Sequence, residues 1–208
     1  MRYLAVILLA VLAAACSSSP DRASTSIASS GAIDLGEFGE RMGILESNGN
    51  YTVVNSFGYL GKYQMGECAL IDAGLYTRDD SGCRSQDWSG RWTGAYGVDS
   101  VDSYLTTADA QDYAFHRFTS GNWSEIRARG LDRYIGLYVN GTLITAAGLL
   151  AGAHLGGVGG IEAFLLSGGA EDRGDANGSR ISTYINLFNG IAPPPSIVGL
   201  NQEAALVF

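Results

Sequence analysis

Apolar residues recur along most of the chain at spacings typical of α-helices. Near the start of this pattern, Phe38, Met42 and Leu45 share one face, which predicts an amphipathic helix that ends at Glu46. Asn48-Gly49 follows, and such a pair commonly ends a helix because both residues tolerate the left-handed backbone conformation. The sequence therefore predicts a mainly α-helical domain with irregular loops and room for a small β-hairpin.

The same spacing predicts further helices in the middle of the chain. Residues 67–75 are expected to form a short helix, and residues 109–118 a longer one with a continuous apolar face. Asn122 is a favoured residue at a helix start, so we expect a separate short helix from there to Ile126.

Residues 143–166 are apolar enough to resemble a membrane-spanning helix. His154, Glu162 and several glycines argue against that interpretation. A helix, a glycine corner and a second helix fit this stretch better, and a further helix is expected around Tyr184.

The first residues have the parts of an export signal, because Arg2 is positively charged, residues 4–15 are apolar and small residues precede Cys16. The apolar run is shorter than the roughly 20 residues that span a membrane. Residues 12–16 resemble a bacterial lipobox, although Ala stands three positions before the cysteine where Leu is usual. A lipobox would make Cys16 a lipid anchor, and ordinary signal cleavage near Ala15 is the alternative.

Composition divides the chain into successive parts. These are a lipoprotein signal peptide (residues 1–16), a Ser-rich flexible tether (17–32), a folded domain (33–191) and a tail (192–208) that begins with three prolines. By analogy with bacterial lipoproteins, Ser17 after the cysteine fits sorting to the outer membrane, facing the periplasm. The expected location is therefore the bacterial cell envelope.

Cysteine use agrees with export. Once Cys16 carries a lipid, Cys68 and Cys83 remain as an even pair in an oxidising compartment. We therefore expect a disulfide between Cys68 and Cys83.

Charge and spacing argue against several ligand classes. The formal net charge of −8 gives no attraction to phosphates, so no nucleic-acid partner is expected. The histidines and the paired cysteines lack metal-ligand spacing, and no metal is predicted. The glycine-rich residues 156–160 lack the Lys-Ser/Thr ending of a phosphate loop.

Glu46 precedes a polar, aromatic and glycine-rich segment. Cleaving a glycosidic bond needs a carboxylic acid that is still protonated near neutral pH, and apolar surroundings favour the protonated form. The rings expected to supply such surroundings are those of Tyr51, Phe57, Tyr59 and Tyr63. A solvated acid at a helix end is the alternative interpretation of Glu46.

Four short motifs follow one another over roughly residues 33–190. They are Glu46-Ser47 at a helix end, Gly61-Lys62-Tyr63-Gln64-Met65, Gly152-Ala153-His154-Leu155-Gly156-Gly157-Val158-Gly159, and Ser182-Thr183-Tyr184-Ile185. In this order they resemble the motifs of the lysozyme-like superfamily, in particular lytic transglycosylases and goose-type lysozymes. Tyr63 stands where those enzymes usually have Met, and His154 where they have Asn.

The resemblance implies a lysozyme-like helical domain and a role for each matching residue. Glu46 would be the catalytic acid. The substrate-binding residues would be Ser47, Tyr63, Gln64, His154, Gly156 and Tyr184. Gln64 and His154 would bind sugar N-acetyl groups or hydroxyls, and Tyr184 would orient Glu46 or an N-acetyl carbonyl. The alternative for Tyr184 and His154 is a place in the core.

The number of carboxylates bears on the reaction, because a glycoside hydrolase usually uses two. The downstream candidates Glu67, Asp72, Asp79 and Asp80 belong to no recognisable motif, so a single catalytic acid is predicted. The resemblance then implies a lytic transglycosylase that needs no cofactor and cleaves between N-acetylmuramic acid and N-acetylglucosamine to leave a 1,6-anhydro end. A hydrolytic muramidase and a non-catalytic peptidoglycan-binding lipoprotein remain alternatives.

The expected partners are peptidoglycan glycan strands and, through the N-terminal lipid, a membrane, while an envelope protein partner is left open. Exposed aromatic rings would help to bind an anionic glycan by stacking. The candidates are Trp88, Trp92, Tyr96 and Trp123, for which local core packing is an equal alternative.

Overall fold

The computed structural model describes residues 35–78, 82–83, 85–174 and 178–199. The chain divides into residues 1–31 and residues 32–208, and every described residue belongs to the second unit. The expected signal peptide, the lipid anchor Cys16, the Ser-rich tether and the pair Asp79-Asp80 lie outside the described residues.

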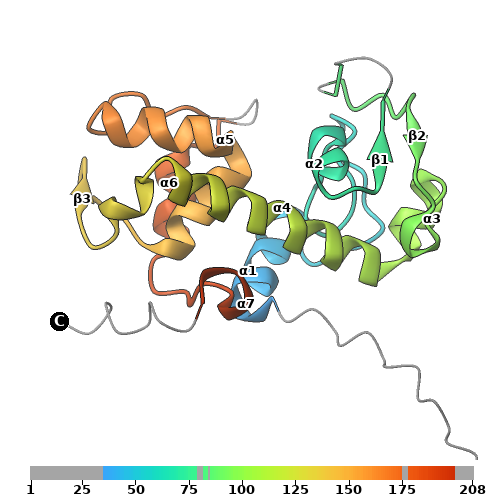
Figure 1. The fold of residues 1–208 in the computed structure, drawn as a ribbon, viewed down its shortest axis with the longest axis horizontal. Helices are drawn as coiled ribbons and strands as arrows, with labels where there is room; N and C mark the ends of the chain where they lie inside the picture. Colours follow the sequence, from blue (N-terminus) through green and yellow to red (C-terminus); the bar gives the residue numbers. More distant parts are fainter. Residues whose placement is uncertain (1–34, 79–81, 84, 175–177, 200–208) are drawn as a thin grey trace, which may run out of the picture. The chain divides into compact units, whose positions relative to one another are not determined.

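The prediction of a mainly α fold is confirmed (Figure 1). The α-helices are α1 (Gly36–Ser47), α2 (Glu67–Asp72), α3 (Val101–Thr106), α4 (Ala108–Ala128), α5 (Ala146–Leu166), α6 (Ile181–Leu187) and α7 (Pro195–Val198). Two short 3-10 helices are η1 (Ala95–Gly97) and η2 (Leu131–Tyr134). The strands pair antiparallel, β1 (Tyr76–Thr77) with β2 (Arg91–Trp92) and β3 (Tyr138–Val139) with β4 (Thr142–Leu143).

The expected small β-hairpin is formed by β3 and β4. Asn140 and Gly141 connect the strands, and their φ angles are 48° and 77°. Positive φ at both central residues is the requirement of the tight hairpin turn for which Asn-Gly is the preferred sequence.

α4 is one helix of 21 residues. The sequence-based prediction of a separate helix starting at Asn122 is wrong, because Asn122 lies inside α4. Phe115, Thr119 and Trp123 are buried at intervals of four residues and carry the apolar face through this point. Figure 1 shows α4 running across the described domain, with α5 along one part of it and α2 and α3 near the other.

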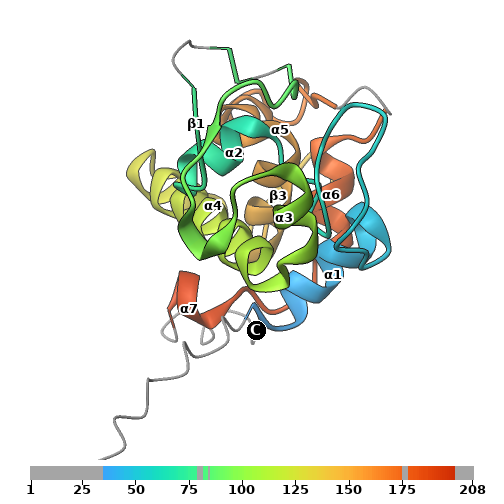
Figure 2. The same cartoon turned by 90° about the vertical axis from the view of Figure 1, so that its right-hand side faces the viewer.

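The prediction of two helical segments joined at a glycine corner is confirmed in α5. Gly157 interrupts the helix with φ 67° and ψ 169°. A β-carbon at Gly156 would come within 2.7 Å of the Ile181 side chain, and one at Gly160 within 2.9 Å. The glycines therefore let α6 approach α5 closely, and the turned view shows α6 near α1 as well (Figure 2).

α5 is also long and apolar enough to cross a membrane by length and composition, but 56% of its most apolar stretch is buried inside the domain. Such burial is typical of a helix that forms part of a domain core.

The folded domain continues beyond residue 191. α7 packs against α4, and Ile197 and Val198 are partly buried against the core. Ser196 Oγ lies 3.3 Å from His116 Nε2 on α4. The first residues of the segment expected to be a tail therefore cover part of α4.

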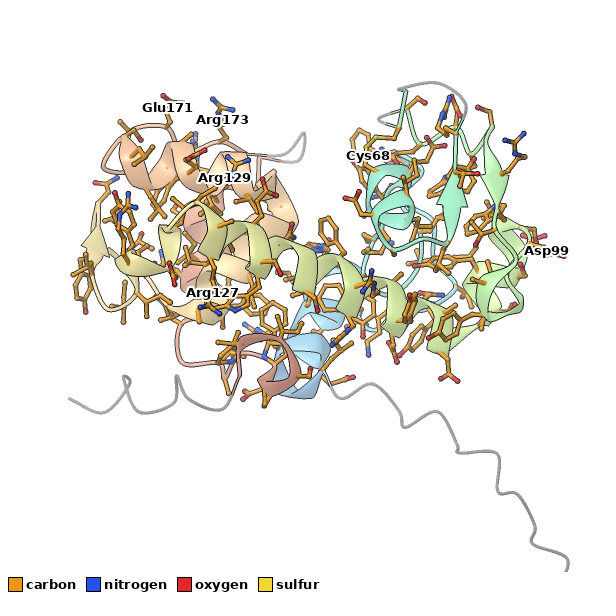
Figure 3. The ribbon with its side chains drawn as sticks, in the orientation of Figure 1. Cys68, Asp99, Arg127, Arg129, Glu171 and Arg173 are labelled. Carbon is orange, nitrogen blue, oxygen red and sulfur yellow. A yellow bond between two sulfur atoms is a disulfide. The ribbon has the colours of Figure 1, made fainter. Side chains whose placement is uncertain are left out.

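The expected disulfide between Cys68 and Cys83 is present, and it joins α2 to the loop before β2 (Figure 3). We predict that replacing both cysteines with alanine lowers the free energy of unfolding by about 3 kcal/mol, because the bridge closes a loop of about 15 residues in the unfolded chain. Urea unfolding of the oxidised protein and of the double variant measures the difference. Equal midpoints and slopes would contradict a stabilising role.

Candidate active site

Glu46 lies in the last turn of α1, where the backbone leaves the helix sharply. Asn48 adopts φ 55°, and the N–H groups of Asn48 and Gly49 donate to the carbonyls of Ile44 and Gly43 at 3.0 and 2.9 Å. Met42 and Phe38, one and two turns before Glu46 on the same side of α1, are buried and fix the helix in the core. The Glu46 side chain is 15% exposed, so the carboxylate is shielded but reachable.

Two residues from the other end of the chain meet this carboxylate. The Tyr184 hydroxyl donates a hydrogen bond of 2.8 Å to Glu46 Oε1, and His154 Nε2 lies 3.5 Å from the same oxygen. The described residues place no hydrogen-bond donor on Oε2. The geometry therefore holds Glu46 by one oxygen and leaves the other for a ligand.

His154 is a buried histidine whose side chain is 10% exposed. The rings of Phe115 and Phe118 on α4 meet it edge to face at centroid distances of 5.6 and 6.0 Å. Burial lowers the pKa of His154, while the Glu46 carboxylate and the Tyr63 backbone carbonyl oppose that effect less strongly. His154 is therefore expected to be neutral at neutral pH.

Ser47 holds the end of α1 against the glycine-rich segment that follows. Its hydroxyl donates to the Lys62 carbonyl at 2.8 Å and accepts a hydrogen bond of 3.0 Å from the Asn50 N–H. Both contacts are to the backbone of this chain, so Ser47 helps to position Glu46 by fixing the end of α1.

Gln64 belongs to a tight turn between Leu60 and Met65, whose backbones pair at 2.9 and 3.0 Å. Gln64 adopts φ 47°, and its side-chain N–H donates to the Gly61 carbonyl at 2.8 Å. The side chain is largely buried, so any contact with a ligand would be through a small exposed part.

Tyr63 is buried rather than displayed on the surface. Its ring stacks on Phe115 at 4.1 Å, and its hydroxyl donates to Asp112 Oδ1 at 2.8 Å. Burial, followed by the Asp112 charge, raises the pKa of Tyr63 far above its ordinary value. The side chain thus supports Phe115, which in turn supports His154.

A polar network that the sequence did not reveal lies beneath this segment. Asp112 accepts from Tyr63 and from the Tyr51 hydroxyl, which is 3.3 Å from Lys62 Nζ. Lys62 also pairs with Glu40 at 2.7 Å. Burial lowers the pKa of Lys62, but its hydrogen bonds to Glu40 and Tyr51 outweigh this and raise it. No motif marks Asp112, so only the fold could identify it.

The surroundings of Glu46 differ from those expected. Tyr51 and Tyr63 are engaged by Asp112, whereas Phe57 and Tyr59 are 48% and 37% exposed on the loop after α1. The rings that organise the site are those of Phe115 and Phe118, which hold His154. Gly156 is exposed, next to the break in α5.

Among the described downstream carboxylates, Glu67 is fully buried and pairs with Arg78 at 2.7 Å. Asp72 lines a cavity of about 340 Å³ between α2 and α4, and burial and Glu125 raise its pKa. Neither residue contacts the Glu46 carboxylate. Phe118 lines this cavity too, and its ring also lies against His154.

The candidate stacking aromatics mostly belong to the core. Trp88 and Trp92 stack on each other at 5.7 Å and pack edge to face against Tyr76, and Trp123 is 4% exposed. Tyr96 is half-exposed and lies against Tyr113. The local-core alternative therefore describes the tryptophans better than sugar stacking does.

Within the part of the chain that the structure describes, no cluster of three or more His, Cys, Asp and Glu side chains could hold a metal ion. Comparisons with family models, curated proteins and solved structures found no match to this chain. The geometry of the site and its sequence motifs are therefore the observations that bear on its chemistry.

Proposed function

We propose that the protein is a peptidoglycan-cleaving lytic transglycosylase of the lysozyme-like superfamily. The observation that carries the proposal is the meeting of Glu46, His154 and Tyr184 at one carboxylate oxygen. These residues come from three separate motifs, and Glu46 and Tyr184 are 138 positions apart in the sequence. Three motifs that resemble one family and converge on one acid favour a shared chemical task.

The chemistry proposed for Glu46 has two proton steps. Glu46 first gives its proton to the glycosidic oxygen as the bond from that oxygen to C1 of N-acetylmuramic acid breaks. The C6 hydroxyl then bonds to C1, and its proton passes to the Glu46 carboxylate, so the 1,6-anhydro ring closes and the acid is regenerated. Oε2 suits this exchange, since Tyr184 donates to Oε1 and His154 Nε2 lies 3.5 Å from that same oxygen.

A glycoside hydrolase usually uses a second carboxylate near its acid. We favour ring closure because neither described candidate for that carboxylate contacts Glu46. Glu67 is committed to Arg78 in the interior, and Asp72 lies at the cavity between α2 and α4. These placements favour a single catalytic acid and keep water attack as the alternative outcome of the test.

The proposed setting is the bacterial envelope, with Cys16 as lipid anchor and peptidoglycan strands as substrate. The Cys68–Cys83 disulfide fits an oxidising compartment outside the cytoplasm. Because the chain is acidic and peptidoglycan is anionic, we expect hydrogen bonds rather than charge attraction to dominate substrate binding.

The test is to incubate purified sacculi with the protein and measure both released glycan and protein that sediments with the sacculi. We expect release by the unmodified chain and sedimentation without release by Glu46→Gln. Sedimentation of both forms with no release by either would instead support a peptidoglycan-binding lipoprotein.

We predict that Tyr184→Phe lowers the rate of glycan release about 10- to 100-fold, because a hydrogen bond to a charged group contributes about 1.5–3 kcal/mol. The ring stays in place, so the thermal midpoint should change little. Initial release rates of the two forms, measured at equal concentration, provide the check. An unchanged rate would assign the Tyr184 hydroxyl to the core alone.

A further inference from the structure

His154 lies beside Glu46 and is packed against residues from several elements of the fold. Phe115 and Phe118 of α4 pack against its ring in edge-to-face pairs, and Nε2 lies 3.5 Å from Glu46 Oε1. Its other nitrogen, Nδ1, is buried and has no hydrogen-bond partner among the described residues. Burial favours the neutral imidazole, while the Glu46 carboxylate and the Tyr63 backbone carbonyl favour the protonated form less strongly.

Glu46 is the ionisable side chain that directly faces His154. α1 contributes the Glu46 carboxylate, and Tyr184 of α6 reaches the imidazole through that carboxylate. The segment before α2 contributes the Tyr63 carbonyl. The α4 residues that clamp the ring carry no charge.

The ionisable neighbours on the same helices are engaged elsewhere. On α4, His116 contacts Ser196 of α7, and Arg117 lines the cavity between α2 and α4. On α5, Glu162 pairs with Arg129. His154 and Glu46 are therefore coupled chiefly to each other.

We propose that His154 is a positioning residue that forms one proton-binding pair with Glu46, and that the form of the pair holding a single proton is the catalytic form. This rests on the proposed glycan cleavage by Glu46. Nε2 of His154 lies 3.5 Å from the Oε1 to which Tyr184 donates, which is close enough for protons on the two residues to influence each other. The pH dependence of the reaction rate would then depend on the protonation of both His154 and Glu46.

Each turnover returns to the pair the one proton that it gives up. The single proton of the pair passes through Glu46 to the glycosidic oxygen, and the C6 hydroxyl returns one proton to the pair through Glu46 when the anhydro ring forms. Loss of the proton at higher pH removes the acid, and a second proton at lower pH puts a cation beside Glu46 and makes its carboxylate a weaker base. The rate should therefore rise and fall with pH.

The first experiment reads the pair without any turnover. Imidazole NMR signals of His154 are followed against pH in the purified protein and in Glu46→Gln, with His116→Gln to assign the two histidines. Loss of the Glu46 charge should lower the pKa of His154, because that charge favours the protonated ring. Identical titration in both forms would overturn the proposal, whether or not the protein cleaves glycans.

The second experiment compares pH–rate profiles of the unmodified chain and His154→Asn, whose amide can still donate to Glu46. We expect the acidic limb of the profile to disappear in the variant. Profiles of the same shape that differ only by a constant factor would give His154 a structural part and overturn the shared titration. Absence of release by the unmodified chain would refute the proposed function, and the NMR titration would still decide the coupling.

Discussion

Glu46→Gln is expected to lower the rate of glycan release by about 10²- to 10⁴-fold, the usual contribution of a positioned general acid and base. The amide has nearly the shape of the carboxylate and can still accept the Tyr184 hydroxyl proton through its oxygen. It cannot give or take the proton that the reaction moves. Initial rates of soluble glycan release from sacculi measure the effect, and the thermal midpoint reports on the fold.

A matched control is Glu37→Gln, because Glu37 is exposed in the first turn of the same helix. We expect this variant to keep the rate and the stability of the unmodified chain. A Glu46→Gln protein that is folded and as active as the control would show that Glu46 is not the acid.

Glu67→Gln is expected to have the largest effect on stability, a loss of about 3–5 kcal/mol in the free energy of unfolding. Glu67 is fully buried, and its partner Arg78 has a side chain only 8% exposed. Removing the carboxylate takes the fully buried acidic partner from a guanidinium that is itself shielded from water, while Asp87, another of its acidic partners, is 47% exposed. Urea unfolding followed by circular dichroism measures the loss.

The control for this change is Glu171→Gln. Glu171 pairs with Arg173 at 3.0 Å, but both side chains are more than half exposed, and Figure 3 shows the pair at the surface. Water screens such a pair, so we expect a change of less than about 1 kcal/mol. Equal losses in the two variants would mean that burial of the Glu67–Arg78 pair does not matter to stability.

The helices could be predicted where local signals agree. The end of α1 followed from Asn48-Gly49, and the corner in α5 from its glycines, because both depend on the backbone conformation of single residues. The supposed break at Asn122 was wrong because an Asn inside a helix resembles one at its start. The buried residues on either side of Asn122, up to Trp123, show that the helix continues through it. Their burial becomes clear only when α5 and α2 pack on α4.

The candidate site was predictable as far as motifs reached. Glu46, His154 and Tyr184 were named from the sequence, and they meet in the fold. Asp112 and the clamp of Phe115 and Phe118 were not predictable, since they lie on α4, outside the motifs, and act through contacts between distant segments. Burial of Tyr63 likewise depends on how its segment folds over α4.

We propose that Glu46 cleaves glycan strands without the attack of water. The most direct measurement is mass spectrometry of the sugar ends released from purified peptidoglycan by a form of the chain that starts at residue 17, beside the same form carrying Glu46→Gln. We expect muropeptides with 1,6-anhydro ends from the unmodified form and none of them in the variant digest. Reducing ends instead would show hydrolysis, and identical digests from both forms would contradict the assignment of Glu46.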